Sequence, residues 1–77
     1  MAIKVLFFAS LRESMGRAAD ELDASDVETV TDVWDAVAGG NAMPSNLLMA
    51  INQDYVNADA RVEDGDEVAF FPPVTGG

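Results

Sequence analysis

A single amphipathic helix constrains the fold of this 77-residue chain more than any other feature of its sequence. Over residues 29–38, four apolar side chains fall at the i, i+3, i+4 and i+7 positions of one helical stripe: Val30, Val33, Trp34 and Val37. Thr29 can cap the start of this helix, and Gly39-Gly40 can end it. A helix with one apolar stripe must bury that stripe against a second layer, so we place Trp34 in the core.

The second layer is predicted from short apolar runs on both sides of the helix. Residues 3–9 alternate as a strand, with Ile3, Val5 and Phe7 on one face and Lys4, Leu6 and Phe8 on the other. Residues 67–71 alternate in the same way, and Pro72-Pro73 ends them because proline cannot donate to a strand ladder. Weaker strands are predicted at residues 17–22, 47–51 and 55–56, with turns at 11–16, 52–54 and 61–66.

The order of strand, strand, helix and further strands predicts a two-layer α+β domain of the β-grasp (ubiquitin-like) type. In it, a mixed sheet is covered on one face by one main helix. That topology, rather than the periodicity, places the first and last strands side by side at the centre. We predict a domain over residues 1–71 and an extended, flexible C-terminal tail over residues 72–77. The alternation puts Phe8 and Phe71 on the sheet face opposite the helix, where they would form an exposed apolar patch.

The composition excludes most catalytic chemistry. The chain has no cysteine and no histidine, which removes thiol nucleophiles, imidazole bases and the usual zinc ligands. The acidic turn around Gly65 is too short for a calcium-binding loop of the EF-hand type. We therefore expect no metal, no bound cofactor and no catalysis by this chain alone.

The charge balance bears on partners. Fourteen acidic residues face four basic ones, for a formal net charge of -10. Nucleic acid and anionic membranes would be repelled, while a basic protein would be attracted; a salt-rich cytoplasm would favour the same composition.

Arg12 and Arg17 are expected in surface ion pairs rather than as phosphate ligands. No leader and no apolar run of about 20 residues is present, so we predict a cytoplasmic protein.

The C-terminal residues have the properties of a handle for another enzyme. Pro72-Pro73 is stiff and extended, and it holds residues 74–77 away from the domain. Gly76 and Gly77 lack a Cβ, so they can enter a slot too narrow for other residues. Two such glycines arise by chance in about 0.5% of sequences at a usage of about 7% each, which favours a function over a frayed end.

Both ends of the chain resemble one family. Residues 65–77, Gly-Asp-Glu-Val-Ala-Phe-Phe-Pro-Pro-Val-Thr-Gly-Gly, closely resemble the end of the small subunit of molybdopterin synthase, the MoaD family. Residues 3–9, Ile-Lys-Val-Leu-Phe-Phe-Ala, resemble the first strand of that family, and the middle agrees in pattern and length. The resemblance implies a ubiquitin-like fold and a role as a sulfur carrier in molybdenum or tungsten cofactor synthesis.

The resemblance also implies a reaction sequence and a set of partners. A ubiquitin-activating-enzyme-like adenylyltransferase, which uses ATP and magnesium, adenylates the carboxylate of Gly77, and a sulfur donor protein converts it to a thiocarboxylate. The tail then enters the large subunit of molybdopterin synthase and delivers sulfur to cyclic pyranopterin monophosphate. Gly76 gives clearance, and the remaining partner-binding positions implied are Pro72, Pro73, Val74, Thr75, Phe71 and Phe8.

The sequence does not exclude two other functions that use an activated terminal glycine. One is a ubiquitin-like modifier, in which Gly77 forms an isopeptide bond with lysines of target proteins. The other is the sulfur carrier for the thiazole of thiamine, which usually lacks the proline pair. The Phe-Phe-Pro-Pro-Val segment, residues 70–74, favours the molybdopterin synthase subunit over both.

Overall fold

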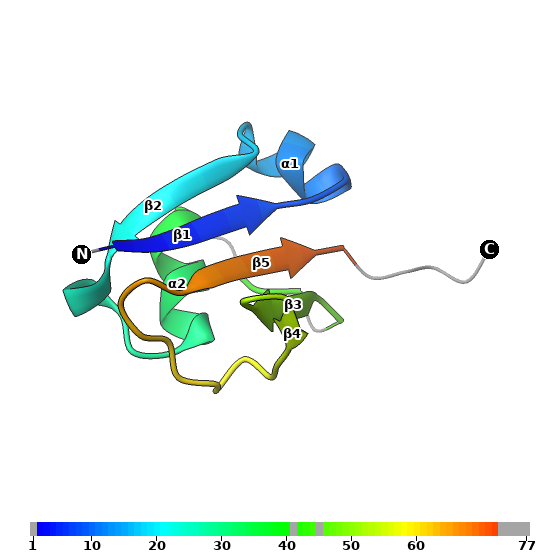
Figure 1. Ribbon diagram of the computed structural model, residues 1–77. Coiled ribbons are helices and arrows are strands. Elements are labelled where there is room, and N and C mark those ends of the chain that lie inside the picture. The colour runs from blue at the N-terminus through cyan, green and yellow to red at the C-terminus, as the bar shows by residue number, and fades with distance from the viewer. Residues whose placement is uncertain (1, 41, 45, 73–77) are drawn as a thin grey trace.

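The computed structural model describes residues 2–40, 42–44 and 46–72. Its elements follow one another as β1 (Ala2–Phe7), α1 (Ser10–Met15), β2 (Ala19–Asp23), the 3-10 turn η1 (Ala24–Asp26), α2 (Val30–Val37), β3 (Leu48–Ile51), β4 (Asp54–Tyr55) and β5 (Glu67–Phe71). Helix α2 lies across one face of a five-stranded sheet (Figure 1). This arrangement confirms the predicted β-grasp. Within the described residues, no helix has the length and apolar character needed to cross a membrane.

The sheet is mixed, with the order β2-β1-β5-β3-β4. The two central strands, β1 and β5, run parallel, and their register places Val5 opposite Val68 and Phe7 opposite Phe70. The other three pairings are antiparallel. The first and last strands therefore lie side by side, as the predicted topology requires.

The core lies between α2 and the central strands. The largest fully buried side chains come from these three elements: Ile3, Val5, Phe7, Val30, Val33, Val68 and Phe70. Trp34 is 3% exposed and meets Phe70 edge to face, with 5.2 Å between ring centroids. The helical stripe and the inward faces of both strands are thus confirmed, and Trp34 belongs to the core.

A capping box begins α2. The Thr29 hydroxyl accepts a hydrogen bond from Asp32 N–H at 3.3 Å, and Asp32 Oδ2 accepts from the N–H groups of Glu28 (2.9 Å) and Thr29 (3.2 Å). These backbone donors favour the ionised carboxylate and hold the pKa of Asp32 below its ordinary value of 3.8. The cap at Thr29 was predicted, whereas the reciprocal bonds of Asp32 emerge from the structure.

Residues 11–16 form most of a helix, not the predicted turn. Helix α1 spans Ser10–Met15 and ends at Gly16, whose φ of 74° is the left-handed conformation that glycine adopts without strain. Leu11 is the one buried side chain of α1, and Met15, one turn later, packs against the core. Two apolar positions in six residues are too few for a periodic pattern that would mark a helix in the sequence. Strand β1 also stops earlier than expected, because the chain bends at Ala9, with φ 53°.

The weaker strands are present at shifted limits. Strand β2 covers residues 19–23 instead of 17–22, β3 begins at residue 48 instead of 47, and β4 covers 54–55 instead of 55–56. Each limit is set by pairing to a neighbouring strand, which local propensity does not report.

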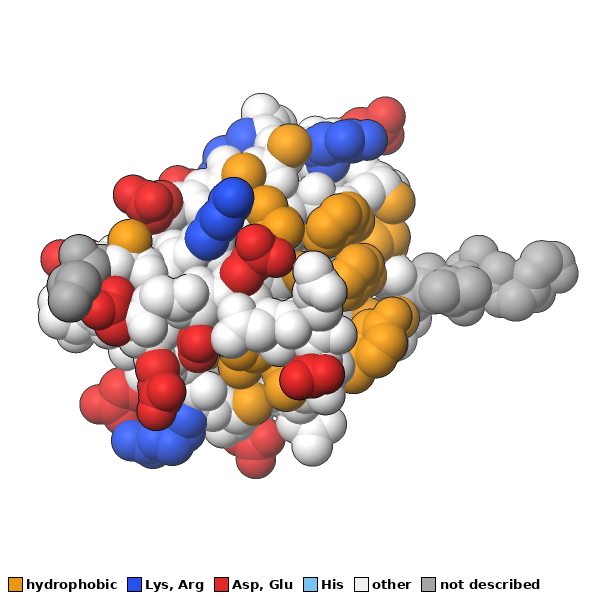
Figure 2. Space-filling view, in the orientation of Figure 1, with side chains coloured by type: hydrophobic (Ala, Val, Ile, Leu, Met, Phe, Trp, Pro, Cys, Tyr) orange, Lys and Arg blue, Asp and Glu red, His pale blue; other side chains and the backbone are white. Residues whose placement is uncertain are grey.

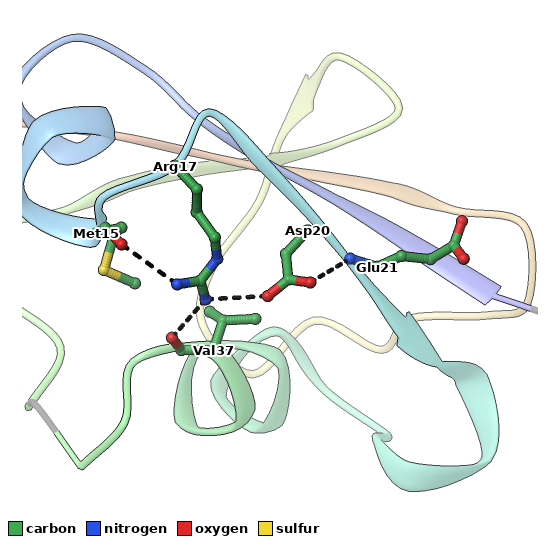
Figure 3. Close-up of polar contacts among 5 residues, drawn as sticks. All are labelled: Met15, Arg17, Asp20, Glu21 and Val37. Atoms are coloured by element: carbon green, nitrogen blue, oxygen red, sulfur yellow. Dashed lines mark hydrogen bonds and ion pairs between the residues drawn. The ribbon is translucent and has the colours of Figure 1, made fainter.

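Arg17 makes the expected surface ion pair and also ties the sheet to the helix (Figure 3). Its Nη2 atom lies 3.0 Å from Asp20 Oδ2 and donates to the carbonyl oxygen of Val37 at 2.9 Å, while Nη1 donates to that of Met15. The guanidinium also lies 5.3 Å from the centroid of the Phe7 ring. Because α2 has no basic residue in its last turn, Arg17 supplies the positive charge that a helix C-terminus favours.

Replacing Phe70 with alanine should lower the free energy of unfolding by about 3–5 kcal/mol, because a fully buried ring leaves a cavity. Denaturant melts of the variant and the wild type would measure this. The matched control is Tyr55→Ala, which removes a ring that is 74% exposed and should cost far less. Equal losses in the two variants would contradict the assignment of Phe70 to the core.

Replacing Asp32 with alanine should destabilise the protein in a pH-dependent way. The lowered pKa means that the carboxylate contributes stability above its ordinary pKa of 3.8, and that this contribution disappears as the pH falls through the native value. The difference in unfolding free energy between wild type and variant should therefore be present at pH 7 and shrink below pH 3.8.

The control for this experiment is Asp35→Ala on the same helix. Asp35 is exposed, and its side chain makes no hydrogen bond within the part of the chain that the structure describes. Each substitution removes one negative charge from an acidic protein. The relief of repulsion among the acidic side chains is therefore the same in both variants and cancels when they are compared. A pH-independent effect of Asp32→Ala, equal to that of the control, would exclude a role for the capping box.

Candidate functional site

The sheet face opposite α2 carries an apolar patch. Side chains from four strands and the residue after β1 line a hollow of about 320 Å³ together with Gln53 and Glu67. We define the open-face patch as Leu6, Phe8, Ala50, Tyr55, Ala69 and Phe71. Figure 2 shows apolar side chains gathered toward the end of the sheet where β1 and β5 finish, with acidic side chains mostly elsewhere on that face. Such a patch is the typical property of a binding surface.

Three aromatic rings form the centre of this patch. Phe8 and Phe71 stack almost face to face, with 4.8 Å between centroids and 8° between planes. The ring of Tyr55 contacts that of Phe71, with 6.0 Å between centroids and 55° between planes. Phe8 is 41% exposed and Tyr55 is 74% exposed, so water contacts a large aromatic area that no described side chain covers. Covering this area with a partner would release that water and be favourable.

The parallel register of β1 and β5 produces the stacked pair. Strand β1 ends at Phe7 and is followed directly by Phe8, and β5 ends with Phe70 and Phe71. Alternation sends one ring of each Phe-Phe step inward and the other outward. Phe7 and Phe70 stack below the sheet at 6.3 Å, and Phe8 and Phe71 stack above it. The structure thus places Phe8 and Phe71 together on the face that the sequence predicted.

The backbone holds Phe8 in position although β1 has already ended. Its N–H donates to the carbonyl oxygen of Phe70 at 3.2 Å, and its carbonyl oxygen accepts from the N–H of Leu11 at 3.1 Å. Helix α1, which the sequence did not predict, therefore fixes one wall of the patch.

Tyr55 is a member of the patch that the sequence reasoning missed. It lies opposite Ala50 in the β3–β4 pair, and β3 in turn pairs with β5, so three strands bring Tyr55 to Phe71. The sequence predicted both strands of this hairpin and the turn between them, but not the register that places Tyr55 opposite Ala50. Without that register, the face on which the ring emerges could not be assigned.

The predicted tail begins beside the patch. Pro72 is half-buried and directly follows Phe71, whose strand neighbour in β3 is Leu48. The other tail positions named from the sequence, Pro73, Val74, Thr75, Gly76 and Gly77, lie outside the described residues. The division at residue 72 therefore stays a prediction.

The lining of the patch is suited to binding a partner. Of its lining side chains, Glu67 is the one that carries a formal charge, and Lys4 lies across the strands from both Glu67 and Glu21. Across residues 2–40, 42–44 and 46–72, no three acidic side chains come together in a group that could hold a metal ion. An aromatic surface with a charged margin fits a protein partner.

The sequence of this chain is similar to those of known proteins. A model of the ThiS family matches residues 5–77 of the chain. The molybdopterin synthase sulfur carrier subunit of Escherichia coli is 47% identical, over 97% of this chain and 99% of that relative. Small archaeal modifier protein 3 of Haloferax volcanii is 32% identical, over 100% of both chains.

Solved structures share the fold. The crystal structure of SAMP1 from Haloferax volcanii superposes with a TM-score of 0.83 at 26% identity, covering 100% of both chains. A complex of subunits 1 and 2 of the molybdopterin-converting factor of Helicobacter pylori contains a chain that matches with a TM-score of 0.68 at 18% identity, again covering 100% of both. The second likeness supports the fold alone.

Proposed function

Since this chain belongs to the ThiS family, we propose that it is the sulfur-carrier subunit of a molybdopterin synthase. The observation that carries this proposal is the 47% identity to the Escherichia coli carrier subunit over almost the full length of both chains. The Phe-Phe-Pro-Pro-Val-Thr-Gly-Gly motif of residues 70–77 supports the same conclusion.

The working group in this proposal is the carboxylate of Gly77. A carboxylate is a poor acyl donor, so an activating partner first uses ATP and magnesium to form an acyl-adenylate, with release of pyrophosphate. A sulfur donor then displaces AMP and leaves a thiocarboxylate, which delivers its sulfur inside the large subunit. The carrier contributes position and a reactive end, and every acid or base belongs to a partner.

The open-face patch is the docking surface in this proposal. Phe8, Tyr55 and Phe71 are rigid aromatic anchors of the kind that dominate binding energy at interfaces. In this proposal the tail starts at Pro72, next to Phe71, so a partner that covers the patch also lies beside the start of the tail. We propose that the large subunit and the activating partner each use this surface.

The remaining sequence expectations follow from the same role. With a net charge of -10, the carrier should avoid nucleic acid and anionic membranes and meet its partners through their basic surfaces. Activation needs ATP, so the carrier is proposed to act in the cytoplasm.

A protein modifier is the second candidate, favoured by the likeness to two Haloferax volcanii modifiers. Intact mass after isolation from cells separates the two functions. A thioacid, about 16 Da heavier than the acid because sulfur replaces oxygen, supports sulfur carriage. A Gly-Gly remnant of this chain on lysines of other proteins supports modification.

Sulfur transfer should require Gly77 at the very end of the chain. Deleting Gly77 shortens the tail by at most about 3.6 Å. This moves the reacting carbon out of the approach distance of about 3 to 3.5 Å. Adding one alanine after Gly77 displaces the carboxylate and introduces a side chain. We expect both variants to lose product formation from cyclic pyranopterin monophosphate in an assay with the large subunit and the activating system.

Both tail variants should keep the unfolding free energy of the wild type, because they change nothing in the core. Mass spectrometry must show that the added alanine is retained. Full activity of the extended carrier under these conditions would refute the terminal-carboxylate mechanism.

Changing Phe71 to arginine should weaken binding of the large subunit at least about tenfold, because it breaks the stack with Phe8 and places a charge in the patch. Calorimetric titration measures the affinity. The matched control is Ala36→Arg, which adds the same charge on the exposed face of α2. If both variants bind like the wild type, Phe71 is not in the interface.

A further inference from the structure

The β3–β4 hairpin carries Tyr55 to the open-face patch, yet its own contacts are few. Strand β4 is two residues long and lies at the edge of the sheet, where it pairs with β3 at two positions. One more backbone bond follows, from the N–H of Val56 to the carbonyl oxygen of Met49 at 3.0 Å. A hairpin this short is at best marginally stable by itself. Contacts outside the hairpin are therefore needed to fix the place of the Tyr55 ring.

The turn of this hairpin needs support as well. Its two central residues, Asn52 and Gln53, have φ angles of 50° and 73°, both in the left-handed region. Two successive left-handed residues are typical of the tight hairpin turn of type I′, which favours Asn followed by Gly. Asn tolerates this region, whereas Gln at the second position costs free energy that glycine would not. The turn therefore gains from contacts that Asn52 makes elsewhere.

Asn52 makes two of these contacts with β5. The antiparallel register of β3 and β5, continued by one residue, places Asn52 opposite Glu67. In a regular ladder two such residues exchange two backbone bonds. The N–H of Asn52 donates to the carbonyl oxygen of Glu67 at 2.8 Å, but the N–H of Glu67 donates to the side-chain Oδ1 of Asn52 at 3.0 Å. The side chain thus replaces a backbone carbonyl, so the ladder continues where the chain already turns.

The amide nitrogen of the Asn52 side chain makes a third bond. Its Nδ2 atom donates to Asp66 Oδ1 at 3.0 Å. Asp66 is itself fixed, because its Oδ2 accepts from the N–H of Glu63 at 2.8 Å and its carbonyl oxygen accepts from the N–H of Lys4, in β1, at 3.0 Å. We call Asn52, Asp66 and Glu67 the hairpin latch, since they join the β3–β4 turn to both central strands.

We propose that Asn52 is a positioning residue for the docking surface. Through the latch it fixes the direction in which β4 leaves the turn relative to β5, and so keeps the Tyr55 ring beside that of Phe71. The inference rests on the proposed function for its effect on partners. A ring that is in place for a fraction of the time lowers the apparent affinity by that fraction, for any partner that covers it.

The position of the ring can be followed by NMR without any partner. The chain has one tyrosine and one tryptophan, so the ring signals of Tyr55 report on the patch and those of Trp34 on the core. Asn52→Gly removes the side chain of the latch and keeps a residue that adopts a φ of 50° freely. We expect the Tyr55 signals to move toward those of the unfolded chain, because the ring current of Phe71 no longer acts on them, while the Trp34 signals stay.

Gln53→Gly is the matched control, because it places a glycine in the same turn and leaves the latch intact. Its Tyr55 signals should keep their displacement from the unfolded position. Unmoved Tyr55 signals in Asn52→Gly would overturn the proposal, even if that variant unfolds more easily, because the latch would then stabilise the fold without placing the ring.

Exchanging the two latch side chains tests the bond itself. Asn52→Asp sets two carboxylates against each other and should displace the Tyr55 signals as Asn52→Gly does. Adding Asp66→Asn restores one donor and one acceptor at the wild-type net charge, with an oxygen left for the N–H of Glu67 and another for that of Glu63. The double variant should regain the wild-type Tyr55 signals. Signals that stay displaced in it would overturn the latch.

A titration with the purified large subunit connects the latch to binding. We expect Asn52→Gly to weaken the affinity about fivefold, and to cause no further loss when added to Tyr55→Ala, because Asn52 acts through that ring. The control is Asn57→Gly, whose exposed side chain makes no hydrogen bond within residues 2–40, 42–44 and 46–72. Additive losses in the double variant would overturn the proposal. A wild-type chain that does not bind the large subunit would refute the proposed function, and the Tyr55 signals would still decide the role of Asn52.

Discussion

The parallel pairing of β1 with β5 is the constraint on which the rest of the structure depends. It joins the two ends of the domain and aligns Phe7 with Phe70. Because side chains alternate along each strand, this one register sets two stacked pairs of rings, one in the core and one on the open face. A shift of β5 by one residue would turn Phe70 to the open face and Phe71 toward α2, which would break both stacked pairs.

The small core is supported by polar contacts at its margins. No polar or charged residue of the described chain is buried, so the interior is wholly apolar. The capping box at Thr29 begins α2, and Arg17 binds the carbonyl of Val37 at its end. These contacts satisfy backbone groups that a short helix leaves without partners. They fix the helix on the sheet without a disulfide, which suits a chain that has no cysteine.

This division of the molecule matches the work of a carrier. The inner face of the sheet is committed to stability, and the outer face is free to be covered and uncovered by partners. In the proposed function, the chain meets an activating partner and the large subunit with the same terminal carboxylate, so its surface must bind both. In the proposed function, the open-face patch is the apolar surface that both partners share.

The sequence by itself determined the stripe of α2, the alternation of β1 and β5, and the side on which Phe8 and Phe71 emerge. These follow from periodicity, which reports whether each face of a segment is buried. Only the tertiary structure showed helix α1, whose single buried anchor is Leu11, the contact of Tyr55 with Phe71, and the bond from Arg17 to Val37, 20 positions away. Each of these depends on how distant segments pair, and local pattern does not encode the register between them.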